Sequence, residues 1–173
     1  MTTATLVPLS EYLSTTYNPD RDFLEGELLE RNIGEQPHSR LQNFFSYIFR
    51  LNRDTWRVRA LPEQRVQVRV ERFRIPDISV IRLDDPADLI LRKPPLICIE
   101  IFSSADAMGD IQKRVNDYAA MGVEHIWAID PWKRLGYYAS PSGFRQPADG
   151  ILRVEGTAIA VSLAEAFAEL DEA

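Results

Sequence analysis

The chain has 173 residues, a formal net charge of −6 and a hydrophobic fraction of 45%. These values predict one water-soluble domain with a sizeable core, residues 1–173. No apolar run approaches the roughly 18 residues of a membrane-spanning helix, and Met1–Ser10 lacks the pattern of a signal peptide. The single cysteine, Cys98, excludes an internal disulfide and a cysteine-based zinc site. We therefore expect a cytoplasmic protein that does not enter a membrane.

Positive charge is concentrated in one segment. Between Arg50 and Arg74, eight arginines stand against three carboxylates, so this segment carries +5 on an acidic chain. It either faces the phosphate backbone of a nucleic acid or forms a solvated hairpin with arginines on its outer face. The sequence leaves both interpretations open.

Short elements precede one long helix in the first third of the chain. A helix is expected over Pro8–Thr16, and a hairpin over Asp22–Arg31 that turns at Gly26. Apolar residues at helical spacing predict a helix from His38 to Arg53. His38, at its start, is either a capping or surface histidine or an active-site group.

The middle of the chain predicts strands. Thr55–Ala60 is expected to be one, and Gln64–Val70 alternates as a half-exposed antiparallel strand does. Glu71–Arg74 interrupts this alternation and is expected to form a turn. A further strand is expected over Ile75–Leu83. The proline before Asp77 cannot donate a ladder hydrogen bond, so Asp77 is expected at the mouth of this strand.

A strand–helix–strand passage follows. Leu96–Ile101 has apolar residues at both odd and even positions, which is typical of a strand covered on both faces. A helix over Asp110–Met121, stopped by Gly122, then leads to a strand over Val123–Asp130, so the two strands should be parallel. A closing hairpin and a last helix over Ser162–Leu170 complete the chain. The predicted fold is α/β, a central mixed and twisted sheet with flanking helices.

Glu100 is the only charged residue inside the apolar strand. Removing a lone carboxylate from water costs several kcal/mol unless a cation compensates it. Glu100 therefore lies in a cleft near the strand end, or pairs with an arginine such as Arg74. Asp77 precedes it by 23 residues and Lys113 follows it by 13, and together they form a candidate site. The alternatives are a capping Asp77 and an ordinary surface Lys113.

Five segments carry a family resemblance. A Pro-Asp pair, 22 intervening residues, a strand glutamate and a later lysine resemble the motif of the PD-(D/E)xK nuclease superfamily. Most of the chain is similar to the Uma-type family of bacterial restriction endonucleases, through the segments DFLEGELLER, PHSRLQ, RIPDISVI, ICIEIFSS and DIQKRVNDYAAMGVEHIWAIDP. The resemblance implies a restriction endonuclease-like fold and a hydrolase, a metal-dependent endonuclease that cuts DNA.

The resemblance also implies a metal site. Asp77 and Glu100, with the backbone carbonyl of Ile101, would hold Mg²⁺ or Mn²⁺, which prefer hard oxygen ligands. Such an ion neutralises the phosphate and lowers the pKa of a bound water. His38 is implied as a catalytic group near the metal, and Glu35 lies just outside it.

One position departs from the superfamily. The lysine is expected two positions after the glutamate, where this chain has Phe102. In the Uma-type family this role passes to the following helix, which points to Lys113 as the catalytic cation. Arg114 is a poorer candidate on this interpretation because it points about 100° away.

Two rival functions remain open. A catalytically silent binding or assembly module would explain the acidic composition and the missing strand lysine. A metal hydrolase acting on a substrate other than nucleic acid is the third possibility. For a DNA endonuclease, cutting two strands implies a homodimer.

Overall fold

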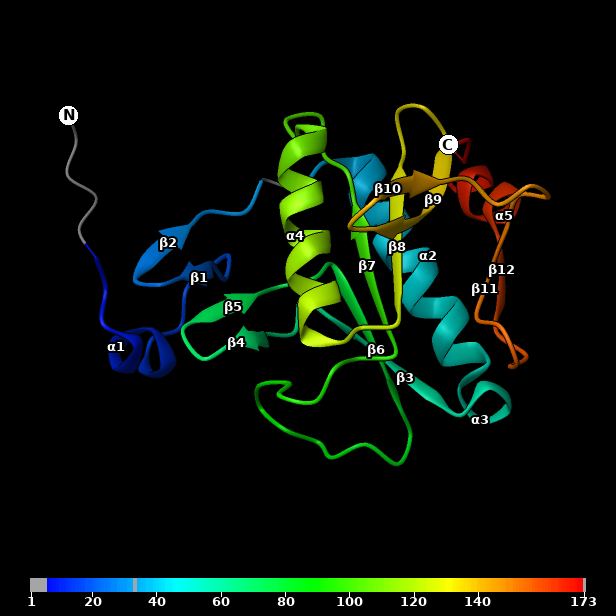
Figure 1. Cartoon of the computed structure of the whole chain (residues 1–173). Coiled ribbons are helices and arrows are strands. Elements are labelled where there is room, and N and C mark those ends of the chain that lie inside the picture. Colours follow the sequence, from blue (N-terminus) through cyan, green and yellow to red (C-terminus); the bar gives the residue numbers. More distant parts are fainter. Residues whose placement is uncertain (1–5, 33, 173) are drawn as a thin grey trace.

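The computed structural model describes residues 6–32 and 34–172. Its centre is a six-stranded sheet with the order β10-β9-β8-β7-β6-β3 (Figure 1). The strands are β3 (Val58–Pro62), β6 (Ile78–Arg82), β7 (Ile97–Ile101), β8 (His125–Asp130), β9 (Leu135–Ser140) and β10 (Gly143–Arg145). β7 and β8 are parallel, whereas the other neighbouring pairs are antiparallel. The predicted central mixed sheet is therefore confirmed.

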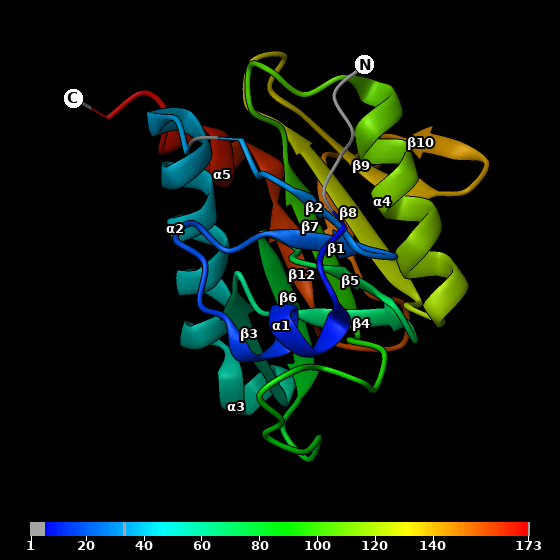
Figure 2. The same ribbon diagram turned by 90° about the vertical axis from the view of Figure 1, so that its left-hand side faces the viewer.

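Helices cover both faces of this sheet (Figures 1 and 2). They are α2 (Gln36–Leu51) and α5 (Leu163–Ala168) on one face and α4 (Met108–Met121) on the other. Side chains alternate along β7, so its isoleucines pack in the core under α2 and Cys98 packs in the core under α4. Glu100 has the same parity as Cys98 and therefore projects toward α4.

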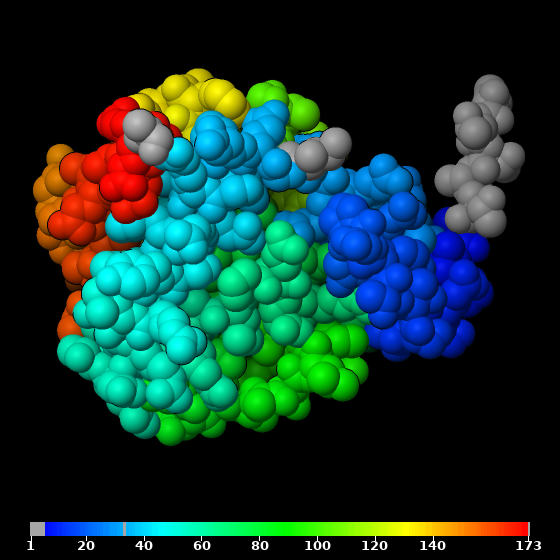
Figure 3. Space-filling view, turned by 180° about the vertical axis from the view of Figure 1, so that it is seen from behind, coloured from blue at the N-terminus to red at the C-terminus, as the bar shows by residue number. Residues whose placement is uncertain are grey.

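A second, smaller sheet has the order β2-β1-β5-β4. It comprises β1 (Asp22–Leu24), β2 (Glu27–Leu29), β4 (Val66–Arg69) and β5 (Arg72–Arg74), and it packs with α1 (Leu9–Ser14). Tyr12, Phe23 and Phe73 form the core between them, with 4.9 Å between the ring centroids of Tyr12 and Phe23. In Figure 3 these blue N-terminal segments and α2, in cyan, lie on either side of green residues from the middle of the chain.

The remaining elements are short. They are α3 (Arg53–Trp56) and the paired strands β11 (Ile151–Arg153) and β12 (Ala160–Ser162). Ser162 accepts a hydrogen bond from the Glu165 amide, which confirms it as the cap of α5. Within the described ranges, no helix is both long and apolar enough to cross a bilayer.

Two segments differ from the prediction. Arg72–Arg74 is strand β5 rather than a turn, because the chain reverses within the two residues before it and lets β5 pair with both β1 and β4. The strand expected from Thr55 begins only at Val58. Arg53–Trp56 continues as a helical turn, which ends at Arg57 in a left-handed conformation with φ of 56°.

Gly122 stops α4 in a conformation that other residues rarely adopt. Its φ is +104°, so Gly122→Ala should lower the free energy of unfolding by about 1–2 kcal/mol. Gly109, near the start of the same helix, has open space around its Cα, and Gly109→Ala should be neutral or stabilise by about 0.5 kcal/mol. Urea unfolding of the two variants measures both effects. Equal effects would show that the left-handed cap is not what stops α4.

Candidate active site

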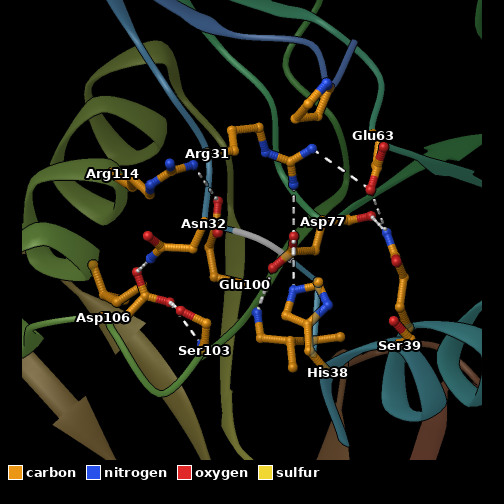
Figure 4. Close-up of a pocket in the computed structure, with 15 residues that line it drawn as sticks. Arg31, Asn32, His38, Ser39, Glu63, Asp77, Glu100, Ser103, Asp106 and Arg114 are labelled. Atoms are coloured by element: carbon orange, nitrogen blue, oxygen red, sulfur yellow. Dashed lines mark hydrogen bonds and ion pairs between the residues drawn. The ribbon is translucent and has the colours of Figure 1, made fainter. Parts of the chain in front are cut away.

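Segments far apart in sequence meet around a cavity of about 250 Å³ at the end of the central sheet (Figure 4). The start of α2, the ends of β6 and β7, and one face of α4 contribute to its wall, together with residues 31, 32 and 34 before α2. Three of the predicted site residues line it, namely Asp77, Glu100 and His38, together with Ile101.

Asp77 closes the end of the ladder between β6 and β7. β6 begins at Ile78 opposite Ile99, so the amide of Ile101 has no strand partner on that side. The Asp77 carboxylate takes its place, and its Oδ2 accepts that amide at 2.7 Å. The side chain is 5% exposed, so this bond fixes its position at the strand mouth, where the sequence predicts it.

The other carboxylate oxygen of Asp77 faces two cationic groups. Oδ1 accepts from Arg31 Nη2 at 2.7 Å and lies 3.1 Å from His38 Nε2 (Figure 4). Burial raises the pKa of Asp77, but His38, Arg31 and the Ile101 amide outweigh burial and leave the pKa below its ordinary value. Asp77 is therefore ionised and compensated within the cavity.

Glu100 projects from β7 toward α4 and is 3% exposed. Its Oε1 accepts from the Tyr118 hydroxyl and lies 3.7 Å from Arg114 Nη1. Burial, opposed by Arg114 and reinforced by the charge of Asp77, raises the pKa of Glu100 to about 7. Glu100 thus lies at a cleft and is also paired, but its cation is Arg114 rather than Arg74.

His38 faces the cavity from the first turn of α2 and does not cap the helix. Burial lowers the pKa of His38, but the hydrogen bond and charge of Asp77 produce a net rise. A carboxylate only accepts hydrogen bonds, so Nε2 carries the proton shared with Asp77. The other ring nitrogen, Nδ1, is buried and has no hydrogen-bond partner in the described part of the chain.

Glu35 lies at the rim of the site. Its carboxylate accepts from the amide of Ser104 at 3.1 Å and from the Ser104 hydroxyl. Nearby, Asn32 donates to Asp106 at 2.8 Å. These contacts join the segment before α2 to the loop between β7 and α4.

Lys113 is not brought into the cavity. Its side chain is 73% exposed and its Nζ binds Asp110 Oδ1 at 3.1 Å, so the expected position of its ammonium is wrong. Arg114 takes that place, 17% exposed and lining the cavity. The apolar spacing of α4 in the sequence favours Arg114 over Lys113. Ile111, Val115 and Tyr118 mark the buried stripe of α4. Position 114 borders this stripe, whereas position 113 lies on the opposite face of the helix.

Arg31 is the second cation that sequence reasoning missed. It reaches Asp77 from 46 residues away along the chain and lies 3.6 Å from Glu63 at the rim. Opposite charges that meet through packing alone leave no periodic pattern, so nothing in the sequence indicates this pair.

The basic segment does not form one outward arginine face. Six of its eight arginines bind carboxylates or carbonyls of the same chain. Arg65 pairs with Asp20, and Arg74 is buried between Asp22 and Asp117. Part of this charge therefore stabilises the small sheet and its contacts with α1 and α4. A phosphate-facing role for the segment stays a prediction.

The donor set fits a hard divalent cation. Asp77 and Glu100 offer buried carboxylate oxygens to one cavity, and the charge of each raises the cost of ionising the other. Residues 6–32 and 34–172 contain no group of three or more acidic, histidine or cysteine side chains placed to hold a metal. Mg²⁺ commonly binds proteins through one or two carboxylates and keeps several waters, so two carboxylates suffice.

Comparison with known proteins identifies the family. The family model described as "Uma2: Putative restriction endonuclease" matches residues 10–157. The chain belongs to the Uma2 family. The resemblance drawn from the sequence is therefore confirmed, and the Uma2 description agrees with a restriction endonuclease-like protein.

A solved structure shows the same fold. It is described as "a putative nuclease belonging to DUF820 from Anabaena variabilis ATCC 29413". The two chains are 21% identical with a TM-score of 0.80, over 95% of this chain and 99% of the other. No curated protein matches the chain.

Glu100 should make stability fall as pH rises. Its pKa is about 7 in the folded protein against an ordinary value of 4.5, so the folded state binds more protons between these pH values. The free energy of unfolding should therefore decrease over this window, by about 3 kcal/mol at most. Glu100→Gln cannot ionise and should lack this decrease.

Urea unfolding at pH 5, 6, 7 and 8 in the presence of EDTA measures the effect. Glu63→Gln is the matched control, because it removes a half-exposed carboxylate from the rim and should keep the decrease. A Glu100→Gln curve parallel to that of the wild type would contradict the assignment.

Proposed function

We propose that this Uma2 protein is a metal-dependent endonuclease that hydrolyses DNA phosphodiester bonds at the cavity. The observation that supports this most strongly is the meeting of Asp77 and Glu100 in one cavity with Arg31, Arg114 and His38. Paired acidic oxygens beside guanidinium groups suit a phosphodiester, which gains negative charge in the transition state.

Asp77 and Glu100 would hold Mg²⁺ or Mn²⁺, with the Ile101 carbonyl as a further ligand. The bound ion would supply charge neutralisation of the phosphate and a lowered pKa for a bound water. The described fold already satisfies one need of such ligands, since the Ile101 amide fixes the Asp77 carboxylate at the strand end.

Arg114 and Arg31 would bind the non-bridging oxygens of the phosphate. A guanidinium presents several donors in one plane, which suits the geometry of phosphate. It stays protonated, so each arginine would stabilise charge without transferring a proton. His38 would orient Asp77 through Nε2 and add positive charge when its ring is protonated.

The proposal extends to the assembly. We expect residues 1–173 to act as a single domain in the cytoplasm and two copies to pair as a homodimer, so that each copy cuts one strand of DNA.

A catalytically silent binding module is the second candidate. It is favoured by the crowding of Asp77, whose two oxygens already accept from Arg31, His38 and Ile101. A silent module should give no calorimetric signal with Mn²⁺ and no metal-dependent rise in melting temperature. The nuclease should give both.

Asp77→Asn should abolish cleavage of DNA in Mg²⁺ or Mn²⁺, with a rate loss of about 100-fold or more. Asparagine keeps the shape and its oxygen can still accept the Ile101 amide, so the fold should persist while the charge and the acceptor that faces Arg31 and His38 are lost. Cleavage of supercoiled plasmid, with circular dichroism as the check on folding, measures this. Asp110→Asn, an exposed acid on α4, is the control and should cleave at the wild-type rate. Undiminished cleavage by Asp77→Asn would refute the nuclease proposal at this site.

Arg114→Gln and Lys113→Gln form a matched pair on one helix. Each removes one positive charge, but only Arg114 lies in the cavity. Arg114→Gln should lower kcat by about 10- to 1,000-fold, whereas Lys113→Gln should stay within about twofold of the wild type. Single-turnover cleavage of a labelled duplex decides between them, and the opposite ranking would restore Lys113 as the cation.

A further inference from the structure

Arg114 is held between two buried carboxylates from different sheets. Its Nη2 lies 3.3 Å from Oδ2 of Asp22, and its Nη1 lies 3.7 Å from Oε1 of Glu100. The contact with Asp22 is the shorter of the two, but both are ion pairs and neither has the geometry of a hydrogen bond. Asp22 is therefore the nearer partner of this guanidinium, although the charge of Glu100 does more than that of Asp22 to raise the pKa of Arg114.

Asp22 is itself fixed in place. It is fully buried in β1, and its carboxylate accepts from Arg74 Nη1 at 2.9 Å and from the Ile75 amide at 3.1 Å. Two partners outside the cavity thus anchor it independently of Arg114. A long arginine side chain loses rotamer freedom when it docks, so a fixed carboxylate determines where its guanidinium rests.

A second buried carboxylate in the same network offers a natural comparison. Asp117 of α4 accepts from Arg74 Nε at 2.8 Å and from Arg72 Nη1 at 2.9 Å. It shares Arg74 with Asp22 and is buried to a similar extent. It makes no ion pair with Arg114 among the contacts of the described residues.

We propose that Asp22 is a positioning residue that turns Arg114 toward Glu100 and the cavity. Asp22 acts through Arg114 and does not line the cavity itself. When the negative charge of Asp22 is removed, the Arg114 guanidinium keeps only the longer contact with Glu100. It is then no longer oriented to bind a phosphate in the cavity. The consequence for rate rests on the proposed nuclease function, whereas the consequence for Arg114 does not.

The kinetic test compares Asp22→Asn with Asp117→Asn. Each removes one buried carboxylate from Arg74, so each weakens the same network, but only Asp22→Asn releases Arg114. In single-turnover and steady-state cleavage of a labelled duplex, Asp22→Asn should lower kcat by about tenfold or more with KM within about twofold. Asp117→Asn should keep kcat within about threefold. An unchanged kcat in Asp22→Asn, or equal losses in the two variants, would overturn the proposal.

A double-mutant cycle tests the same contact without any activity. The unfolding equilibrium constants of Asp22→Asn, Arg114→Gln and the double variant should show roughly tenfold coupling. The cycle of Asp117→Asn with Arg114→Gln should show coupling within about twofold. Equal coupling in both cycles overturns the inference. Coupling at Asp22 in a wild-type protein that cleaves no DNA would support the positioning role and reject the nuclease function.

Should Asp22→Asn fail to fold, Asp22→Glu takes its place in both tests. It keeps the negative charge but adds a methylene group in a fully buried position, which shifts the carboxylate relative to Arg114. We expect a loss of kcat of several-fold with KM retained. A wild-type kcat in a folded Asp22→Glu would overturn the proposal.

Discussion

Two carboxylates buried side by side at the end of one sheet determine how the rest of the site is arranged. The Asp77 side chain is 5% exposed and Glu100 is 3% exposed, and burial raises the pKa of both. The net pKa shifts of the two carboxylates nevertheless have opposite signs. Three donors lower the pKa of Asp77, whereas Glu100 keeps a pKa of about 7. Environments that separate two acids in this way are typical of sites where charge or protons are handled.

Each of these acids also stabilises the fold. Asp77 supplies the partner that the Ile101 amide lacks where β6 begins, and Glu100 binds the Tyr118 hydroxyl from α4. The small sheet contributes as well, because Arg74 joins Asp22 of β1 to Asp117 of α4. The candidate site and the surrounding fold therefore share the same buried charges. Substituting one of these charged residues should change both the site and the free energy of unfolding.

The arginines of this chain give the site its particular chemistry. The position two residues after Glu100 is occupied by Phe102, which packs in the core under α4. Positive charge reaches the cavity instead through Arg114 from α4 and Arg31 from the segment before α2. A guanidinium remains charged at any physiological pH and presents a planar set of donors, so this site is suited to holding an anion in a fixed orientation.

Much of the architecture could be predicted from the sequence. The run of apolar residues from Leu96 to Ile101 indicated a strand covered on both faces, and the helical spacing after it indicated the crossover helix that covers one of them. Asp77 and Glu100 could be singled out because one follows a proline at a strand start and the other is a lone charge in an apolar strand. The prediction for Lys113 is wrong because it rests on charge and spacing alone, whereas the apolar stripe of α4 lies beside Arg114 and opposite Lys113.

The amino-acid sequence by itself determined the family, the central sheet with its helices, and the two acids of the candidate site. Only the tertiary structure decided which cations meet those acids. Arg31 binds Asp77 across 46 residues of the chain, and Asp22, in β1 of the small sheet, pairs with Arg114 of α4. The reason is physical. The spacing of apolar residues follows from local backbone geometry, so it can be recognised in the sequence. A buried ion pair depends on which side chains come together after separate segments have packed.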